Sequence, residues 1–147
     1  MLNNIAQQPL PAAAPQQLGV VLVVDDQPSV RLVLGRLLAL NGCAARHATC
    51  LTEVKTVLER ERIDAFLIDL TLAEGESGLD VLAWIRTQPT HKRTPILVFT
   101  GLAAVSSAQE ELIRRGDASV VYKTDTLRLA VESVKKLLVN RSAKNSR

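Results

Sequence analysis

Five short apolar runs, each followed by a segment of helix length, leave few folds open to this chain. Repeated strand–helix units predict a parallel sheet with helices on both faces. Right-handed crossovers allow few topologies, and the flavodoxin-like strand order 2-1-3-4-5 is common at this size. We therefore expect a single α/β domain with a doubly wound (βα)5 sheet. The expected strands are Val20–Val24, Ala44–His47, Ala65–Ile68, Ile96–Phe99 and Ser119–Tyr122.

The expected helices are bounded by residues that favour helix ends. Asn41-Gly42 should end the first helix and Gly116 the fourth, since glycine and asparagine are common just past a helix. Thr49 is a candidate cap for the second helix. The expected helices are Ser29–Leu40, Leu51–Arg60, Leu79–Thr87, Ser106–Arg115 and Leu127–Asn140.

The two ends of the 147-residue chain differ in composition from its middle. Residues 1–18 are rich in Gln, Pro and Ala, which predicts a disordered leader. Residues 19–140 form the expected domain, and residues 141–147 a short basic tail. The late basic residues could touch nucleic acid or an acidic partner, but a solvated helix face and frayed tail is the favoured interpretation.

Composition is that of an ordinary globular protein, with 47% hydrophobic and 22% charged residues. No apolar run approaches the roughly 18 residues of a membrane-spanning helix, and the N-terminus lacks the pattern of a signal peptide. Cys43 and Cys50 have neither CxxC nor zinc-ligand spacing, and we expect them to be buried or half-buried in a reducing compartment. These features predict a cytoplasmic protein without a membrane partner.

Carboxylates follow two of the expected strands. Asp25 and Asp26 come after the first strand, and Asp69 comes after the third. In the expected strand order these strands are neighbours, so the three acids should meet at the carboxyl edge of the sheet. Like charges about 4 Å apart repel by roughly 4 kcal/mol at an effective dielectric near 20. Such a cluster indicates a site for a divalent cation.

Two further residues lie at the same edge, since Thr100 ends the fourth strand and Lys123 follows the fifth. With these motifs the sequence resembles the receiver domain of bacterial two-component response regulators over about residues 19–140. A lone Asp-Asp pair is common, whereas four such motifs in order are specific. The motifs are Val23-Val24-Asp25-Asp26, Leu67-Ile68-Asp69, Val98-Phe99-Thr100-Gly101 and Val121-Tyr122-Lys123.

The resemblance implies that Asp69 accepts a phosphoryl group from a phosphohistidine. It also implies a bound Mg²⁺, a cation that suits hard carboxylate oxygens. Asp26 and Asp69 would bind the ion directly, Asp25 through water, and Thr71 through its backbone carbonyl.

The phosphoryl group would be held by residues after the fourth and fifth strands. By resemblance, Thr100 donates its hydroxyl to one phosphoryl oxygen and moves inward, and Lys123 offers its ammonium to another. Gly101 leaves the pocket open to the donor. Phosphoryl transfer depends on positioning and charge neutralisation more than on covalent assistance.

The loop after Asp69 departs from the family pattern. Ala73 stands where the family usually has proline, and the loop reaches its glycine, Gly78, one residue later than usual. We therefore expect Leu70–Ser77, which contains Glu74 and Glu76, to be longer and more acidic than usual.

The switch positions of the family also differ here. Thr124 follows Lys123 in place of proline, and a non-proline cis bond costs about 2.5–4 kcal/mol against about 0.5–1 for X-Pro. We therefore predict a trans Lys123–Thr124 bond. Val120 stands where the family often has an aromatic ring, and Tyr122 should share its side of the strand. The usual aromatic switch is accordingly not expected.

The resemblance predicts a stand-alone receiver that signals through protein contacts and is not a turnover enzyme. Its partners would be a histidine kinase or phosphotransfer protein, a downstream protein, and a second copy on the face of the fourth helix, fifth strand and fifth helix. The alternative is a pseudo-receiver, a constitutive interaction or dimerisation module. The first helix could dock a partner or merely pack the domain, because its apolar residues wrap beyond one stripe. These residues are Val30, Leu32, Val33, Leu34, Leu37, Leu38 and Leu40.

Two other function classes are disfavoured. A phosphoaspartate hydrolase typically has an Asp-x-Asp pair on its first strand, whereas Asp25 and Asp26 are adjacent. Specific DNA binding is not expected, because no helix-turn-helix follows the receiver segment. His47 and His91 show no partner pattern, and His91 is expected to be exposed.

Overall fold

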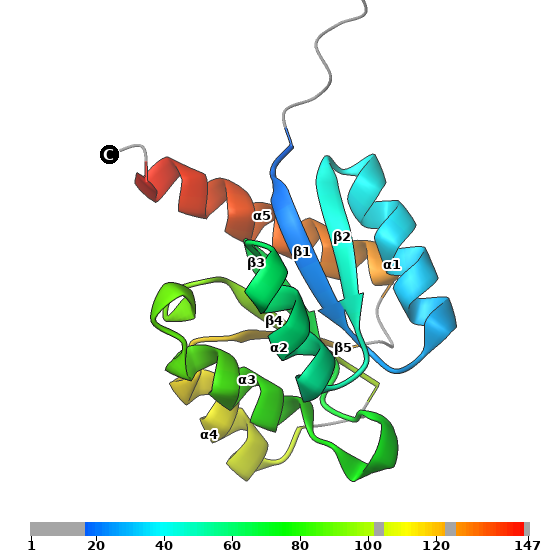
Figure 1. The fold of residues 1–147 in the computed structure, drawn as a ribbon, viewed down its shortest axis with the longest axis vertical. Helices are drawn as coiled ribbons and strands as arrows, with labels where there is room; N and C mark the ends of the chain where they lie inside the picture. Colours follow the sequence, from blue (N-terminus) through cyan, green and yellow to red (C-terminus); the bar gives the residue numbers. More distant parts are fainter. Residues whose placement is uncertain (1–16, 102–104, 123–125, 146–147) are drawn as a thin grey trace, which may run out of the picture.

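A computed structural model describes residues 17–101, 105–122 and 126–145 of the protein. Five parallel strands form one sheet in the order β2-β1-β3-β4-β5. Figure 1 shows helices on both faces, with α1 and α5 on one side and α2, α3 and α4 on the other. The predicted fold is confirmed, including its strand order. The strands are β1 (Gly19–Val24), β2 (Cys43–Ala48), β3 (Ala65–Ile68), β4 (Ile96–Thr100) and β5 (Ser119–Tyr122).

The helices begin close to their expected positions because local capping signals mark them. Ser106 and Gln109 form a reciprocal capping box before α4. Gly42 has a φ of 79° just after α1, which glycine adopts without strain. The described helices are α1 (Pro28–Leu40), α2 (Leu51–Arg60), α3 (Gly78–Thr87), α4 (Ser107–Arg115) and α5 (Leu127–Asn145), with 3₁₀ turns η1 (Ala73–Gly75) and η2 (Pro89–His91).

Two helix predictions are wrong. The helix expected to end at Asn140 continues to Asn145, and Arg141 within this extension donates from Nη1 to the Asp64 carbonyl oxygen at 2.9 Å. That contact fastens the last turns of α5 to the start of β3. Thr49 does not cap α2; the helix has Cys50 at its N-cap, and the Thr49 amide instead donates to the Glu53 carboxylate at 2.8 Å.

The hydrophobic core lies in two layers, one on each side of the sheet. Successive strand residues point to opposite faces, so Phe66 and Ile68 pack with α2, α3 and α4, and Leu67 packs with α1 and α5. All residues of β3 and β4 are buried, as expected of central strands covered on both faces. The predicted burial of the cysteines is confirmed, with Cys43 buried and Cys50 half-buried.

At the amino ends of β4 and β5, the guanidinium of Arg86 on α3 binds several backbone carbonyl oxygens. This group donates to the carbonyl oxygens of Gly116 (2.6 Å), His91 (2.7 Å), Thr94 (2.7 Å) and Asp117 (3.2 Å). It therefore joins the segments that lead into β4 and β5. Burial lowers the pKa of Arg86 from its ordinary value, and nearby Asp117 partly opposes this.

His91 lies in the same region and is buried, so the prediction that it is exposed is wrong. Its Nδ1 is 2.9 Å from Thr94 Oγ1, and its ring packs edge-on against Phe66 with 5.3 Å between centroids. The η2 turn, which begins at Pro89, folds this polar stretch back onto the core. Burial lowers the pKa of His91, and Arg141, Arg86 and Arg62 lower it further. None of the helices in the described segments combines the length and apolar character needed to cross a membrane.

Candidate phosphoacceptor and metal site

The three predicted acids meet at the carboxyl edge of the sheet. The β1 and β3 ladders continue into them, because the Asp25 amide donates to Ala48 at 3.1 Å and the Asp69 amide to Val24 at 2.9 Å. Asp25 and Asp69 are buried, and Asp26 is half-buried. The backbone of the sheet therefore sets the positions of the two buried acids.

Their carboxylates are close enough to share one cation. One oxygen from each of Asp25, Asp26 and Asp69 lies within 4.8 Å of the others. At that separation two unit negative charges repel by about 3 kcal/mol at an effective dielectric near 20. Hard carboxylate oxygens are the ligands that Mg²⁺ takes in proteins, commonly one or two of them with waters. The donor set thus fits a magnesium ion.

The turn between β1 and α1 is organised by Asp25. Its Oδ1 accepts the Gln27 amide at 2.9 Å, and its carbonyl oxygen accepts Arg31 Nη1 at 2.7 Å. Pro28 begins the helix, where its missing amide is not needed. Arg31 was not singled out from sequence, since nothing in the sequence reveals a contact to a backbone oxygen six residues away.

The loop after β3 brings Thr71 beside the acid that precedes it. The Thr71 amide is 3.3 Å from Asp69 Oδ1, and Thr71 forms an isolated antiparallel bridge with Ser77. The loop turns through η1, where Glu74 has a φ of 60° and Gly75 a φ of 75°. The structure thus places Thr71 next to the candidate phosphoacceptor.

Gly78 passes very close to the phosphoacceptor backbone. A Cβ at this position would lie 1.9 Å from the Asp69 carbonyl oxygen, which no side chain can tolerate. The Gly78 amide donates to the Leu70 carbonyl oxygen at 2.8 Å. The sequence marked Gly78 only as the end of the loop, whereas the structure shows that close approach requires glycine here.

The remaining predicted site residues lie at the ends of β4 and β5. Thr100 is fully buried and ends β4 opposite Tyr122 of β5, and Gly101 follows it in an exposed position. Val120 and Tyr122 pack against the same core layer, as predicted. Lys123 and Thr124 lie outside the described residues, so the trans bond between them stays a prediction.

Comparison with known proteins agrees with this geometry. The chain matches the response regulator receiver domain over residues 21–135, and it therefore belongs to that family. Receiver domains are signalling modules of two-component systems that work with histidine kinases or phosphotransfer proteins, and magnesium and phosphorylation are typical of them.

Two curated relatives illustrate the sequence similarity. The response regulator protein PilR of Pseudomonas aeruginosa is 34% identical over 91 residues, which cover 62% of this chain and 20% of PilR. The alginate biosynthesis transcriptional regulatory protein AlgB of Pseudomonas syringae pv. tomato is 32% identical over 121 residues, which cover 80% of this chain and 26% of AlgB. The chain thus spans about a quarter or less of the length of these relatives.

Solved structures show the same fold at lower identity. A CheY-like response regulator receiver domain protein from Methanospirillum hungatei matches with a TM-score of 0.75 and 19% identity, covering 85% of this chain and 97% of that one. The receiver domain of a LuxO repressor protein from Vibrio parahaemolyticus gives a TM-score of 0.74 and 21% identity, covering 86% and 95%.

Proposed function

We propose that this chain is a phosphorylatable receiver that takes a phosphoryl group on Asp69 and signals through protein contacts. The observation that carries the proposal is the set of three carboxylates within 4.8 Å at the ends of neighbouring strands β1 and β3. Buried Thr100, at the end of the adjacent strand β4, adds a hydroxyl on the same edge.

The proposed reaction transfers one phosphoryl group from a phosphohistidine. The N–P bond of the donor breaks, a P–O bond forms to a carboxylate oxygen of Asp69, and the released imidazole takes up a proton. Asp26 and Asp69 would hold Mg²⁺ directly, with Asp25 acting through water and Thr71 through its carbonyl oxygen, and the ion would neutralise charge on the phosphoryl oxygens.

Two further predicted site residues would hold the transferred group. The Thr100 hydroxyl can donate to one phosphoryl oxygen, and the Lys123 ammonium can neutralise another. Gly101, which has no side chain, keeps this side of the pocket open to the donor. Such placement matters because this transfer depends on electrostatic stabilisation more than on covalent chemistry.

The donor protein would dock on α1, which leads away from Asp25 and Asp26. Within this helix Leu34 and Leu38 are buried, whereas Leu32, Val33 and Leu40 are 57%, 40% and 82% exposed. The helix thus has one apolar face that packs the domain and further apolar side chains in solvent. The buried residues account for packing of the domain, and the exposed ones support the proposal that α1 docks a histidine kinase or phosphotransfer protein.

The test is phosphorylation by a small donor. The protein is incubated with acetyl phosphate and Mg²⁺, and its intact mass is measured beside that of Asp69→Ala and Asp69→Asn. The proposal expects one phosphoryl adduct on the wild-type protein and none on either variant. Asp80→Asn, which changes an exposed acid on α3, is the matched control and should be labelled normally. Labelling of the Asp69 variants, or no labelling of the wild type by acetyl phosphate or a cognate kinase, would contradict it.

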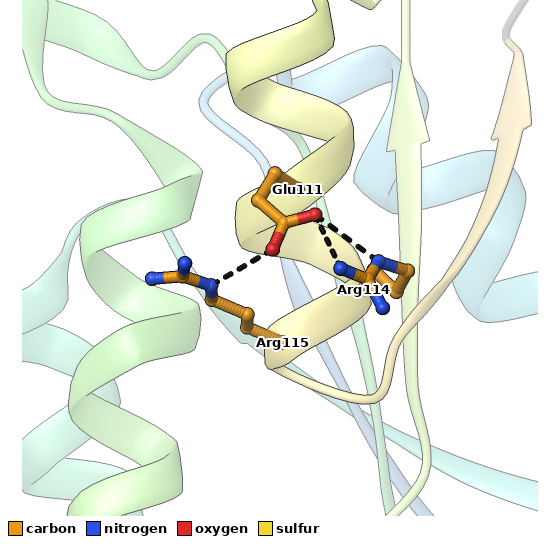
Figure 2. A network of polar contacts seen from close by, with 3 residues as sticks. All are labelled: Glu111, Arg114 and Arg115. Atoms are coloured by element: carbon orange, nitrogen blue, oxygen red, sulfur yellow. Dashed lines mark hydrogen bonds and ion pairs between the residues drawn. The ribbon is translucent and has the colours of Figure 1, made fainter.

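A pseudo-receiver that acts as a dimerisation module is the second candidate. It is favoured by Val120, whose side chain packs against the core and carries no ring that could rotate. On the neighbouring helix α4, Leu112 is 49% exposed beside a charged network. Figure 2 shows this network, in which the Glu111 carboxylate binds Arg114 at 2.6 Å and Arg115 at 2.9 Å. These hydrogen bonds lower the pKa of Glu111.

The two candidates differ in what phosphorylation does to assembly. A switching receiver changes its oligomeric state or partner affinity when beryllofluoride, a phosphoryl mimic, is added with Mg²⁺. Size-exclusion chromatography with light scattering measures this directly. Unchanged assembly and partner affinity after full loading would favour the pseudo-receiver.

A further inference from the structure

The N-terminus of α2 is capped by a residue from the loop after β3. Within the described residues, Cys50 at the N-cap makes no side-chain capping hydrogen bond. The amide of Leu51, the first residue of the helix, instead donates to Glu76 Oε1 at 2.5 Å, across 25 positions of sequence. The first amides of a helix need acceptors, and negative charge is stabilised there. A carboxylate distant in sequence thus takes the place of a local cap.

The backbone of the same residue closes the η1 turn. The Glu76 carbonyl oxygen accepts the Leu72 amide at 3.0 Å, and the Glu76 amide donates to the Ala73 carbonyl oxygen at 3.2 Å. Inside this turn Glu74 has a φ of 60°, a conformation that residues other than glycine adopt only when their surroundings hold it. The turn therefore depends on the contacts that anchor it.

This turn and the metal site share one short segment. Thr71 lies between Leu70 and Leu72, which are both buried in the core, and it bridges to Ser77 beside Glu76. Its amide contacts the Asp69 carboxylate. Thr71 thus belongs to a loop whose far end is joined to the N-terminus of α2 by the Glu76 side chain.

We propose that Glu76 is a positioning residue for the metal site: its hydrogen bond to the α2 N-terminus holds the Thr71 carbonyl in place beside Asp69. The proposal rests on the proposed function, because it assigns Thr71 as a magnesium ligand. Partners that orient the ligands of a metal typically change its affinity about 10- to 100-fold when removed. Glu76 acts through the loop and is not expected to touch the ion or the phosphoryl group.

The test compares Glu76→Ala with Glu76→Gln. The glutamine amide oxygen can still accept the Leu51 amide, whereas alanine cannot. The Mg²⁺ dependence of Asp69 labelling by acetyl phosphate is measured for each protein. We expect Glu76→Ala to raise the Mg²⁺ midpoint about tenfold, with a near-normal rate at saturating Mg²⁺, and Glu76→Gln to restore the wild-type midpoint. Glu74→Gln removes an exposed charge from the same loop and serves as the control.

A second readout does not depend on metal or phosphorylation. Hydrogen exchange at the Leu51 and Leu72 amides, measured without Mg²⁺, should be faster in Glu76→Ala and unchanged in Glu76→Gln. If Glu76→Ala does not fold, Glu76→Asp replaces it. Aspartate keeps the negative charge, but its shorter side chain should not reach the Leu51 amide.

The outcomes separate this inference from the proposed function. If the wild type is labelled and Glu76→Ala has the wild-type Mg²⁺ midpoint, the inference is wrong and the function stands. A glutamine variant that behaves like alanine would also overturn it, since charge rather than the hydrogen bond would then matter. A wild-type protein that is not labelled contradicts the proposed function. Unchanged hydrogen exchange at the Leu51 and Leu72 amides in Glu76→Ala contradicts the inference that Glu76 holds the loop against α2, whatever the labelling result.

Discussion

The two edges of the sheet differ in whether their charged groups have partners within the described part of the chain or repel one another. At the amino edge, the Arg86 guanidinium donates to four backbone carbonyl oxygens, so its hydrogen bonds are made within the chain. At the carboxyl edge, Asp25, Asp26 and Asp69 bring like charges within 4.8 Å. The first arrangement stabilises the fold, and the second is suited to a cation and a phosphoryl group from outside. Removing a charge should therefore destabilise the protein at the amino edge and stabilise the metal-free protein at the carboxyl edge.

The largest expected effect is the loss of stability in Arg86→Ala. Removing the guanidinium leaves carbonyl oxygens at the starts of β4 and β5 without their donor, and the free energy of unfolding should fall by about 3 kcal/mol. Urea denaturation measures this loss. Arg93→Ala, at an exposed position nearby, is the control and should change stability by less than about 0.5 kcal/mol. Equal losses of stability in both variants would show that the hydrogen bonds of Arg86 do not account for the loss in Arg86→Ala.

Gly78→Ala should damage the carboxyl edge directly. The added methyl group cannot fit 1.9 Å from the Asp69 carbonyl oxygen, so the loop or the end of β3 must shift. We expect a loss of about 2 kcal/mol in the free energy of unfolding and slower labelling of Asp69 by acetyl phosphate. Gly35→Ala, within α1 and with 3.4 Å between the added atom and its nearest neighbour, is the matched control. Normal labelling of Gly78→Ala would contradict the close approach.

Asp26→Asn should stabilise the protein when Mg²⁺ is absent. Removing one of three clustered charges relieves repulsion, and we expect a gain of about 1 kcal/mol in the free energy of unfolding. The same variant should require more Mg²⁺ for labelling. Thermal unfolding with and without Mg²⁺ checks both effects. A variant that is less stable than the wild type without Mg²⁺ would show that the cluster is not repulsive.

The smallest effect concerns pH at the amino edge. The pKa of His91 is lowered below its ordinary value of 6.5, chiefly by burial, so the folded state binds fewer protons than the unfolded state. His91 therefore favours folding most above pH 6.5, and stability should fall as the pH drops from 6.5 toward the folded pKa. His91→Gln should reduce this slope in denaturation measurements between pH 7.5 and about 5.5.

His47 also contributes to the pH dependence of stability, so a variant of His47 serves as the comparison for His91→Gln. Its pKa is lowered by burial and by Arg31 and Arg46, so it contributes a slope of the same sign. His47→Gln should remove only the contribution of His47 to the slope of stability against pH. A slope that is unchanged in His91→Gln and absent in His47→Gln would place the whole pH dependence on His47.

The fold and the acid cluster were predictable because local patterns determine them. Apolar runs give the strands, and right-handed crossovers restrict their order, so the residues just after β1 and β3 must lie together. Gly116 marked the end of α4 for a similar local reason.

The remaining features depend on contacts between distant segments. Glu76 meets Leu51 across 25 positions, and Arg86 meets Gly116 across 30. His91 is buried because its ring packs edge-on against Phe66, which belongs to another element. Hydrophobic periodicity does not report such pairings, which is why an exposed His91 and an early end of α5 were predicted.

The central claim is that the carboxyl edge accepts a phosphoryl group at Asp69. Borohydride reduces an aspartyl phosphate to homoserine, so treatment of the acetyl phosphate-labelled protein marks the modified residue permanently. Peptide mass spectrometry should find homoserine at position 69 when Mg²⁺ is present and little when it is omitted. Homoserine at position 25 or 26, or a phosphoryl label on the folded wild type without homoserine at position 69, would contradict phosphorylation of Asp69.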